Sequence, residues 1–131
     1  MIAPTVHEPT MIGLSERTHP LLKRLKEEGH FAEMADAYRL GIALALAYEI
    51  KPDEISGGKQ TVFSVATIDP DRDIATAVRT ILGDDGASIY RHVERLAEWG
   101  VTELARRAEA GEIDFAGLLS EVTRLAGGEN E

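Results

Sequence analysis

Two short segments contain residue types at spacings that other proteins use to bind ligands. Residues 56–61 read SGGKQT, so Gly58 and Lys59 precede a hydroxyl residue, as in a phosphate-binding loop. That motif needs an earlier glycine, a Ser or Thr directly after the lysine, and a helix after the loop. Here the earlier glycine is missing, Gln60 intervenes and a strand is expected to follow. We therefore interpret this segment as a glycine turn.

The second segment is DPDRD at residues 69–73, which spaces three carboxylates as in a calcium-binding loop. Such a loop also needs glycine at its sixth position and glutamate at its twelfth, where this chain has Ile74 and Thr80. A helix start explains the segment better, with Asp69 as the cap and Pro70 at the first helical position. We expect no metal site here.

Catalytic patterns are also missing from the rest of the chain. The histidines are not spaced as a metal-binding pair, and no serine lies in a G-x-S-x-G turn. The sequence predicts no catalytic residue, no metal and no cofactor, so we expect a protein that is not an enzyme.

Arg91 and Arg95 lie one helical turn apart among glutamates, which favours intrahelical ion pairs, with phosphate contact as the alternative.

Composition bounds the class of protein. The 131 residues include 23 acidic and 14 basic side chains, for a net charge of −9, and no cysteine. The length fits one domain, and the absence of cysteine fits a reducing cytoplasm. No apolar run is long enough for a membrane span. The acidity argues against indiscriminate binding to nucleic acid, although four of the basic residues fall between positions 17 and 26.

Hydrophobic periodicity predicts a mainly α fold, a compact helical domain of about five helices with one or two short strands. We expect a flexible arm over 1–9, a single helical domain over 10–126 and a disordered tail over 127–131. Strands are predicted at 10–14 and 61–68. Helices are predicted after Thr18 up to Gly29, over 31–49, from Asp69 to Gly83, over 87–110, and after Asp114. Glycine inside a helix is unfavourable, so Gly100 predicts a close helix approach.

The segment from Leu40 to Tyr48 contains only apolar residues and glycine. In so small a protein this predicts either a central helix or a subunit interface. The candidate interface residues are Leu40, Ile42, Leu44 and Leu46.

The order of a short strand, a capped helix, a glycine turn and an apolar helix resembles a ribbon-helix-helix module over about 40 residues. The matching stretches are MIGLSERTHPLLKRLKEEG and FAEMADAYRLGIALALAYE. The resemblance implies a dimer whose paired strands enter the DNA major groove. However, the strand TMIGL offers only Thr10 for reading bases.

The same opening, together with the alanine- and leucine-rich helix and the later GGKQTVF segment, resembles the DNA sulfur modification protein DndE family over about residues 11–105. That resemblance implies a small helical accessory protein that forms oligomers and binds DNA through basic residues, within the machinery that installs phosphorothioate. The candidate DNA-backbone contacts are Arg17, Lys23, Arg24, Lys26 and Lys59.

Three functions remain open from the sequence. The first is a non-catalytic oligomeric accessory protein of a DNA modification or defence system, with DNA and other subunits as partners. The second is a ribbon-helix-helix regulator or antitoxin. The third is an acidic protein–protein adaptor that does not bind DNA.

Overall fold

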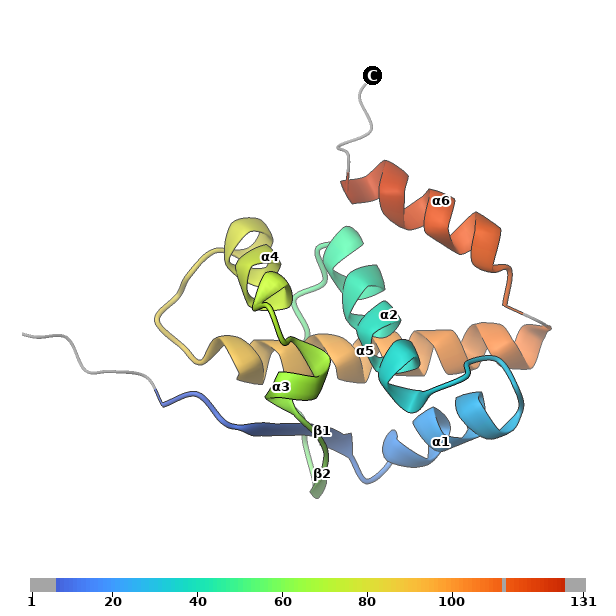
Figure 1. The fold of residues 1–131 in the computed structure, drawn as a ribbon, viewed down its shortest axis with the longest axis horizontal. Coiled ribbons are helices and arrows are strands. Elements are labelled where there is room, and N and C mark those ends of the chain that lie inside the picture. Colours follow the sequence, from blue (N-terminus) through green and yellow to red (C-terminus); the bar gives the residue numbers. More distant parts are fainter. Residues whose placement is uncertain (1–6, 112, 127–131) are drawn as a thin grey trace, which may run out of the picture.

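One long helix runs along the longest axis of the molecule, and four of the other elements, three helices and one strand, pack against it (Figure 1). The structure is a computed structural model that describes residues 7–111 and 113–126. Within these residues it contains six helices and one two-stranded sheet, which confirms the predicted mainly α fold. The elements are β1 (Met11–Ser15), α1 (His19–Glu27), α2 (Met34–Ala47), β2 (Lys59–Ser64), α3 (Val65–Ile68), α4 (Asp73–Leu82), α5 (Ile89–Ala110) and α6 (Phe115–Ala126).

The centre of the core is the crossing of α2 over α5. The close helix approach predicted at Gly100 is confirmed, because Gly100 meets Gly41 of α2 there. A Cβ atom built on Gly100 would lie 2.0 Å from the carbonyl oxygen of Gly41, closer than any real contact. The two backbones therefore touch directly, and only glycine fits at this point of α5.

The two strands pair with each other in one chain. They run antiparallel from the pair Met11 and Ser64 to the pair Ser15 and Lys59, with one register irregularity after Ile12. The predicted strand over 61–68 is wrong in its second half, because residues 65–68 form the one-turn helix α3. The side chain of Ser64 accepts a hydrogen bond from the backbone N–H of Thr67, which caps this turn and ends the strand.

The start of α4 also differs from the prediction. The helix begins at Asp73 and not at Pro70, after Arg72 in a left-handed conformation with φ of 62°. Asp69 nevertheless acts on this helix, since its two carboxylate oxygens accept hydrogen bonds from the N–H groups of Ile74 and Ala75 at 2.9 and 3.0 Å. Tyr90 donates its hydroxyl proton to the same carboxylate at 2.8 Å. Burial and this bond to Asp69 raise the pKa of Tyr90 to about 12.

The remaining helix boundaries follow the predictions within a few residues. The long helix begins after Ser88, whose hydroxyl accepts from the N–H of Arg91, and α6 begins after Asp114, which accepts from the N–H of Gly117. The helix predicted over 31–49 begins later, at Met34. The tail predicted over 127–131 and residues 1–6 of the arm lie outside the described residues.

The described end of the predicted arm is attached to the domain. The half-buried Glu8 carboxylate accepts hydrogen bonds from the Ser88 hydroxyl at 2.6 Å and from the N–H groups of Ile89 and Tyr90 at 3.0 and 3.1 Å. A carboxylate in this position stabilises a helix N-terminus. Burial raises the pKa of Glu8, but these hydrogen bonds outweigh it and hold the pKa below the ordinary 4.5.

This anchor predicts a pH-dependent stability contribution. A carboxyl group with a lowered folded-state pKa stabilises the fold above its unfolded pKa, and the contribution is lost as the pH falls through the folded value. We therefore expect Glu8→Gln to lower the free energy of unfolding by about 1 kcal/mol at pH 7. The difference from the parent protein should shrink as the pH falls below 4.5. Urea unfolding of both proteins at pH 7 and pH 3 measures it, and an equal loss at both pH values would contradict this explanation.

Candidate functional site

One face of α5 holds alternating basic and acidic residues. Arg91, Glu94, Arg95 and Glu98 are spaced so that they share one side of the helix. The strand β1 lies against this face. The Glu94 side chain is almost completely buried, with 3% of its surface exposed, whereas the arginines stay in partial contact with solvent.

The two glutamates bind the backbone of β1. Glu94 Oε2 accepts from the N–H of Gly13 at 3.0 Å, and Glu98 Oε1 accepts from the N–H of Ser15 at 3.0 Å. The hydroxyl of Tyr38 donates to the carbonyl oxygen of Gly13 at 2.9 Å. These side chains occupy the strand edge that does not pair with β2.

The ribbon-helix-helix resemblance implies a ribbon between two chains, whereas β1 pairs here with β2 of the same chain. One edge of β1 is paired with β2, and the other is occupied by side chains of α5 and α2. A strand of a second chain would have to displace those hydrogen bonds. Four of the five β1 residues are also buried, so their side chains cannot read base edges.

The Thr18 side chain binds Glu98 of α5 and does not cap α1. Thr18 occupies the predicted N-cap position of α1, with Pro20 in the first turn, but its side chain makes no cap hydrogen bond. Instead, its hydroxyl donates to Glu98 Oε2 at 2.7 Å, as does the hydroxyl of Ser15. The turn before α1 is thus fixed to α5.

Three basic side chains surround one open cavity of about 260 Å³ beside this face, and we call it the basic cavity. They are Lys59 from β2 and Arg91 and Arg95 from α5. Lys59 Nζ and an Arg91 guanidinium nitrogen each lie 2.9 Å from Glu94 Oε1, while Arg95 lies 3.7 Å from Glu54. The lining therefore holds three cations and two carboxylates, Glu54 and Glu94, which leaves one net positive charge in an acidic protein.

The cations of the basic cavity are held in place but remain partly accessible. The exposed fractions of the Lys59, Arg91 and Arg95 side chains are 33%, 46% and 28%. Ion pairs at such partly exposed positions are weak. A phosphate group can therefore replace water around these cations while Glu94 keeps two of them positioned.

The candidate contacts on α1 form a different surface. Lys23, Arg24 and Lys26 are exposed, and Arg24 pairs with Glu28 at 3.4 Å. Lys23 and Arg24 line an open groove of about 530 Å³ together with Gln60 of β2. Lys59 lines the basic cavity instead, because successive residues of a strand face opposite sides. The structure thus separates Lys59 from the α1 residues.

Arg17, the remaining candidate contact, lines neither the basic cavity nor the groove on α1. Its side chain is 71% exposed and lies 3.6 Å from Glu98, one turn along α5 from Glu94. The turn that holds it also contacts the glycine segment, since the N–H of Glu16 donates to the carbonyl oxygen of Gly58 at 3.0 Å. Arg17 therefore lies beside the same face of α5 as the basic cavity.

The candidate oligomer residues belong to the core of one chain. Ile42, Leu44 and Leu46 are buried, and Leu40 is half-buried against the core. The burial of Ile42, Leu44 and Leu46 fits the alternative, a central helix, and the oligomer interface stays a prediction. The apolar run is explained by the many neighbours of α2, which packs against α1, α5 and α6.

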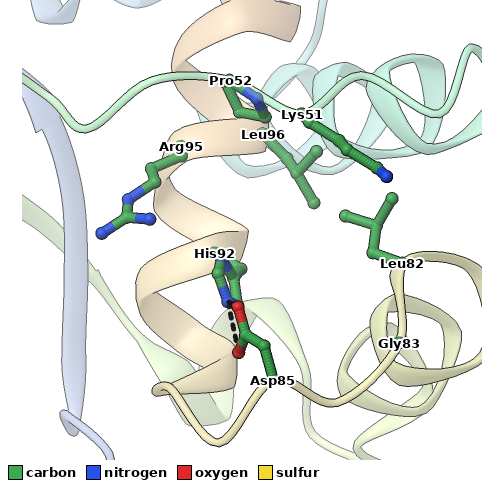
Figure 2. A pocket seen from close by; sticks show the side chains of 8 residues that line it. All are labelled: Lys51, Pro52, Leu82, Gly83, Asp85, His92, Arg95 and Leu96. Carbon is green, nitrogen blue, oxygen red and sulfur yellow. Dashed lines mark hydrogen bonds and ion pairs between the residues drawn. The ribbon is translucent and has the colours of Figure 1, made fainter.

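A second cavity of about 250 Å³ lies on the neighbouring side of α5 and shares Arg95 with the first. Figure 2 shows His92 at its edge, with its Nε2 atom paired to the carboxylate of Asp85 at 3.2 Å. No group of three metal-ligating side chains occurs in the part of the chain that the structure describes. Within those residues, no helix is long and apolar enough to cross a membrane.

Sequence reasoning identified Lys59, Arg91 and Arg95 separately but did not bring them together. It predicted intrahelical ion pairs, which is confirmed for Glu94 with Arg91, but it did not predict that Glu94 and Glu98 also bind β1. No local pattern distinguishes a glutamate that caps a distant strand from one that faces water.

Comparison of the chain with protein-family models, with curated proteins and with solved structures found no match.

Proposed function

We propose that this chain is a non-catalytic accessory protein that contacts the backbone of DNA. In this proposal it acts with copies of itself and with other subunits of a cytoplasmic DNA modification or defence system of the phosphorothioation type. The observation that supports it best is the basic cavity, in which Lys59, Arg91 and Arg95 surround a space of about 260 Å³.

The charge arrangement suits phosphate contact without base reading. Phosphate contacts position a protein on DNA, whereas sequence is read by side chains that reach base edges. Exposed or partly exposed cations lie on α5, β2 and α1 beside exposed carboxylates, and the residues of β1 are mostly buried. This favours backbone contact over the regulator or antitoxin alternative.

The proposal predicts salt-sensitive binding that depends on the basic cavity. We expect the double variant Arg91→Gln with Arg95→Gln to weaken binding to duplex DNA at least roughly tenfold, because even one charge-assisted hydrogen bond contributes about 1.5–3 kcal/mol where it forms. The slope of log K against log salt should also fall by about 0.9 for each phosphate contact removed. Fluorescence anisotropy of one labelled duplex at several salt concentrations measures both quantities.

Matched variants assign the contact to a surface. Arg106→Gln removes one exposed arginine further along the same helix and should leave binding unchanged. The variant Lys23→Glu with Lys26→Glu tests the α1 surface separately. If only that variant abolishes binding, DNA contact moves from the basic cavity to α1. A preference for nicked over intact duplex supports the modification-system part of the proposal.

The adaptor alternative has one observation of its own. Phe115 and Leu119 of α6 are 39% and 59% exposed, which leaves apolar surface for a protein partner. An apolar interface does not weaken steeply with salt as phosphate binding does. Absence of DNA binding at low salt would refute the DNA proposal for the isolated chain and favour this alternative.

A further inference from the structure

The second cavity beside α5 has the composition of a small-molecule site. It lies between the N-terminal half of α5, the end of α4 and the segment that follows α2. Its volume of about 250 Å³ is just below the ~300–1,000 Å³ of pockets that hold drug-sized ligands, so a ligand here must be small.

Apolar and polar groups are separated within this cavity. Leu82, Leu96 and Pro52 supply apolar lining, and Lys51 supplies an ammonium group. Figure 2 shows the Lys51 side chain extending toward Leu82, while the guanidinium group of Arg95 points the other way. Arg95 pairs with Glu54 at 3.7 Å, so Lys51 is the cation available to a ligand in this space.

The acidic group at the edge of the cavity already has partners. Asp85 accepts a hydrogen bond from the N–H of Ala87 at 2.9 Å and pairs with His92 at 3.2 Å. The backbone N–H of Ala87 and the side chain of His92 lower the pKa of Asp85, so this group is ionised at neutral pH. The Asp85 carboxylate interacts with the N–H of Ala87 and with His92, whereas Lys51 forms no ion pair with any of the described residues.

We propose that this cavity binds a small organic acid, a carboxylate attached to a compact aliphatic body. The carboxylate pairs with the Lys51 ammonium group, and the aliphatic body packs against Leu82 and Pro52. The two cavities share Arg95 in their lining, but the proposed ligand pairs with Lys51, which does not line the basic cavity. The test of this site therefore does not depend on whether the chain binds DNA.

The experiment is an NMR titration of the full chain, followed in backbone amide spectra, with 4-methylpentanoate as the probe. The neutral 4-methylpentanamide tests the need for charge, and acetate and inorganic phosphate test the need for the aliphatic body. We expect saturable shifts of the amides of Lys51, Leu82, Gly83 and His92 with 4-methylpentanoate. Each of the other three compounds should bind at least about tenfold more weakly.

Two variants connect the binding to the cavity. Lys51→Met keeps an unbranched apolar stem and removes the charge, so it should weaken 4-methylpentanoate binding about tenfold. Lys26→Met makes the same change at an exposed position of α1 and should have no effect. The proposal is overturned if no saturable shifts occur up to about 10 mM, if acid and amide bind equally, or if Lys51→Met binds like the parent protein.

Discussion

Gly100→Ala is expected to lower the free energy of unfolding by at least about 3 kcal/mol. On an exposed helix the same change stabilises by about 1 kcal/mol, since alanine is the better helix former. Here the added methyl group would lie 2.0 Å from the carbonyl oxygen of Gly41 and 2.3 Å from its carbonyl carbon. Both are backbone atoms, so relief requires α2 and α5 to move apart.

The opposite glycine provides an internal comparison. A Cβ atom on Gly41 would lie 3.0 Å from the nearest backbone atoms of Gly100 and Val101, which is tight but can be relieved by small shifts. We therefore expect Gly41→Ala to cost less, about 1 kcal/mol. Urea unfolding at constant m-value measures both. Thr102→Ala, at an exposed position of the same helix, is the control. Equal stability of the Gly100→Ala variant and the parent protein would show that the helices do not touch at this point.

Glu94→Ala is expected to lower the free energy of unfolding by about 2–4 kcal/mol. The substitution removes the acceptor for the N–H of Gly13, which is buried, and the shared partner of Lys59 and Arg91. An unsatisfied buried N–H costs about 1–3 kcal/mol. Loss of the ion pairs with Lys59 and Arg91 lowers the free energy of unfolding less than loss of fully buried ion pairs would, because both cations reach solvent and are screened there.

Glu94→Gln separates the two contributions. The amide oxygen of glutamine can still accept from Gly13, so we expect a smaller loss of about 1–2 kcal/mol, which reflects mainly the missing charge. Glu109→Gln, at an exposed position of the same helix, should change stability by less than about 0.5 kcal/mol. Hydrogen exchange at the Gly13 amide gives a local readout, since it should accelerate far more in Glu94→Ala than in Glu94→Gln. Equal exchange in the two variants would contradict the capping role of Glu94.

Elements marked by strong local signals were predicted well. The long helix over 87–110 occurs as Ile89–Ala110, and the apolar spacing along it describes its buried side correctly. The close approach at Gly100 followed from one rule, that a helix keeps an unfavourable glycine where a neighbour leaves no room for a side chain. The partner Gly41 could not be identified this way, because the rule specifies a contact and not its location.

Predictions failed where a side-chain hydrogen bond to the backbone overrides the preference indicated by the sequence pattern. Residues 65–68 are rich in β-branched side chains, yet the capping bond from Thr67 to Ser64 turns them into α3. Asp69 caps α4 from five and six residues away, across a left-handed Arg72, so the helix begins later than the aspartate suggests. In both places the deciding interaction is a side-chain hydrogen bond that periodicity does not record.

The helical class, the position of the long helix and the apolar character of α2 could be predicted from the residues alone, because periodicity and helix termini are local properties. How the charged residues are used depends on contacts that exist only in the folded chain. Glu94 and Glu98 look like the acidic half of a surface ion-pair ladder, but packing of β1 on α5 turns both toward the strand edge. The same packing brings Lys59 beside Arg91, 32 positions further along the chain, on one carboxylate oxygen. Hydrogen bonds and ion pairs of this kind depend on distances between elements, and the chain sets those distances only when it is folded.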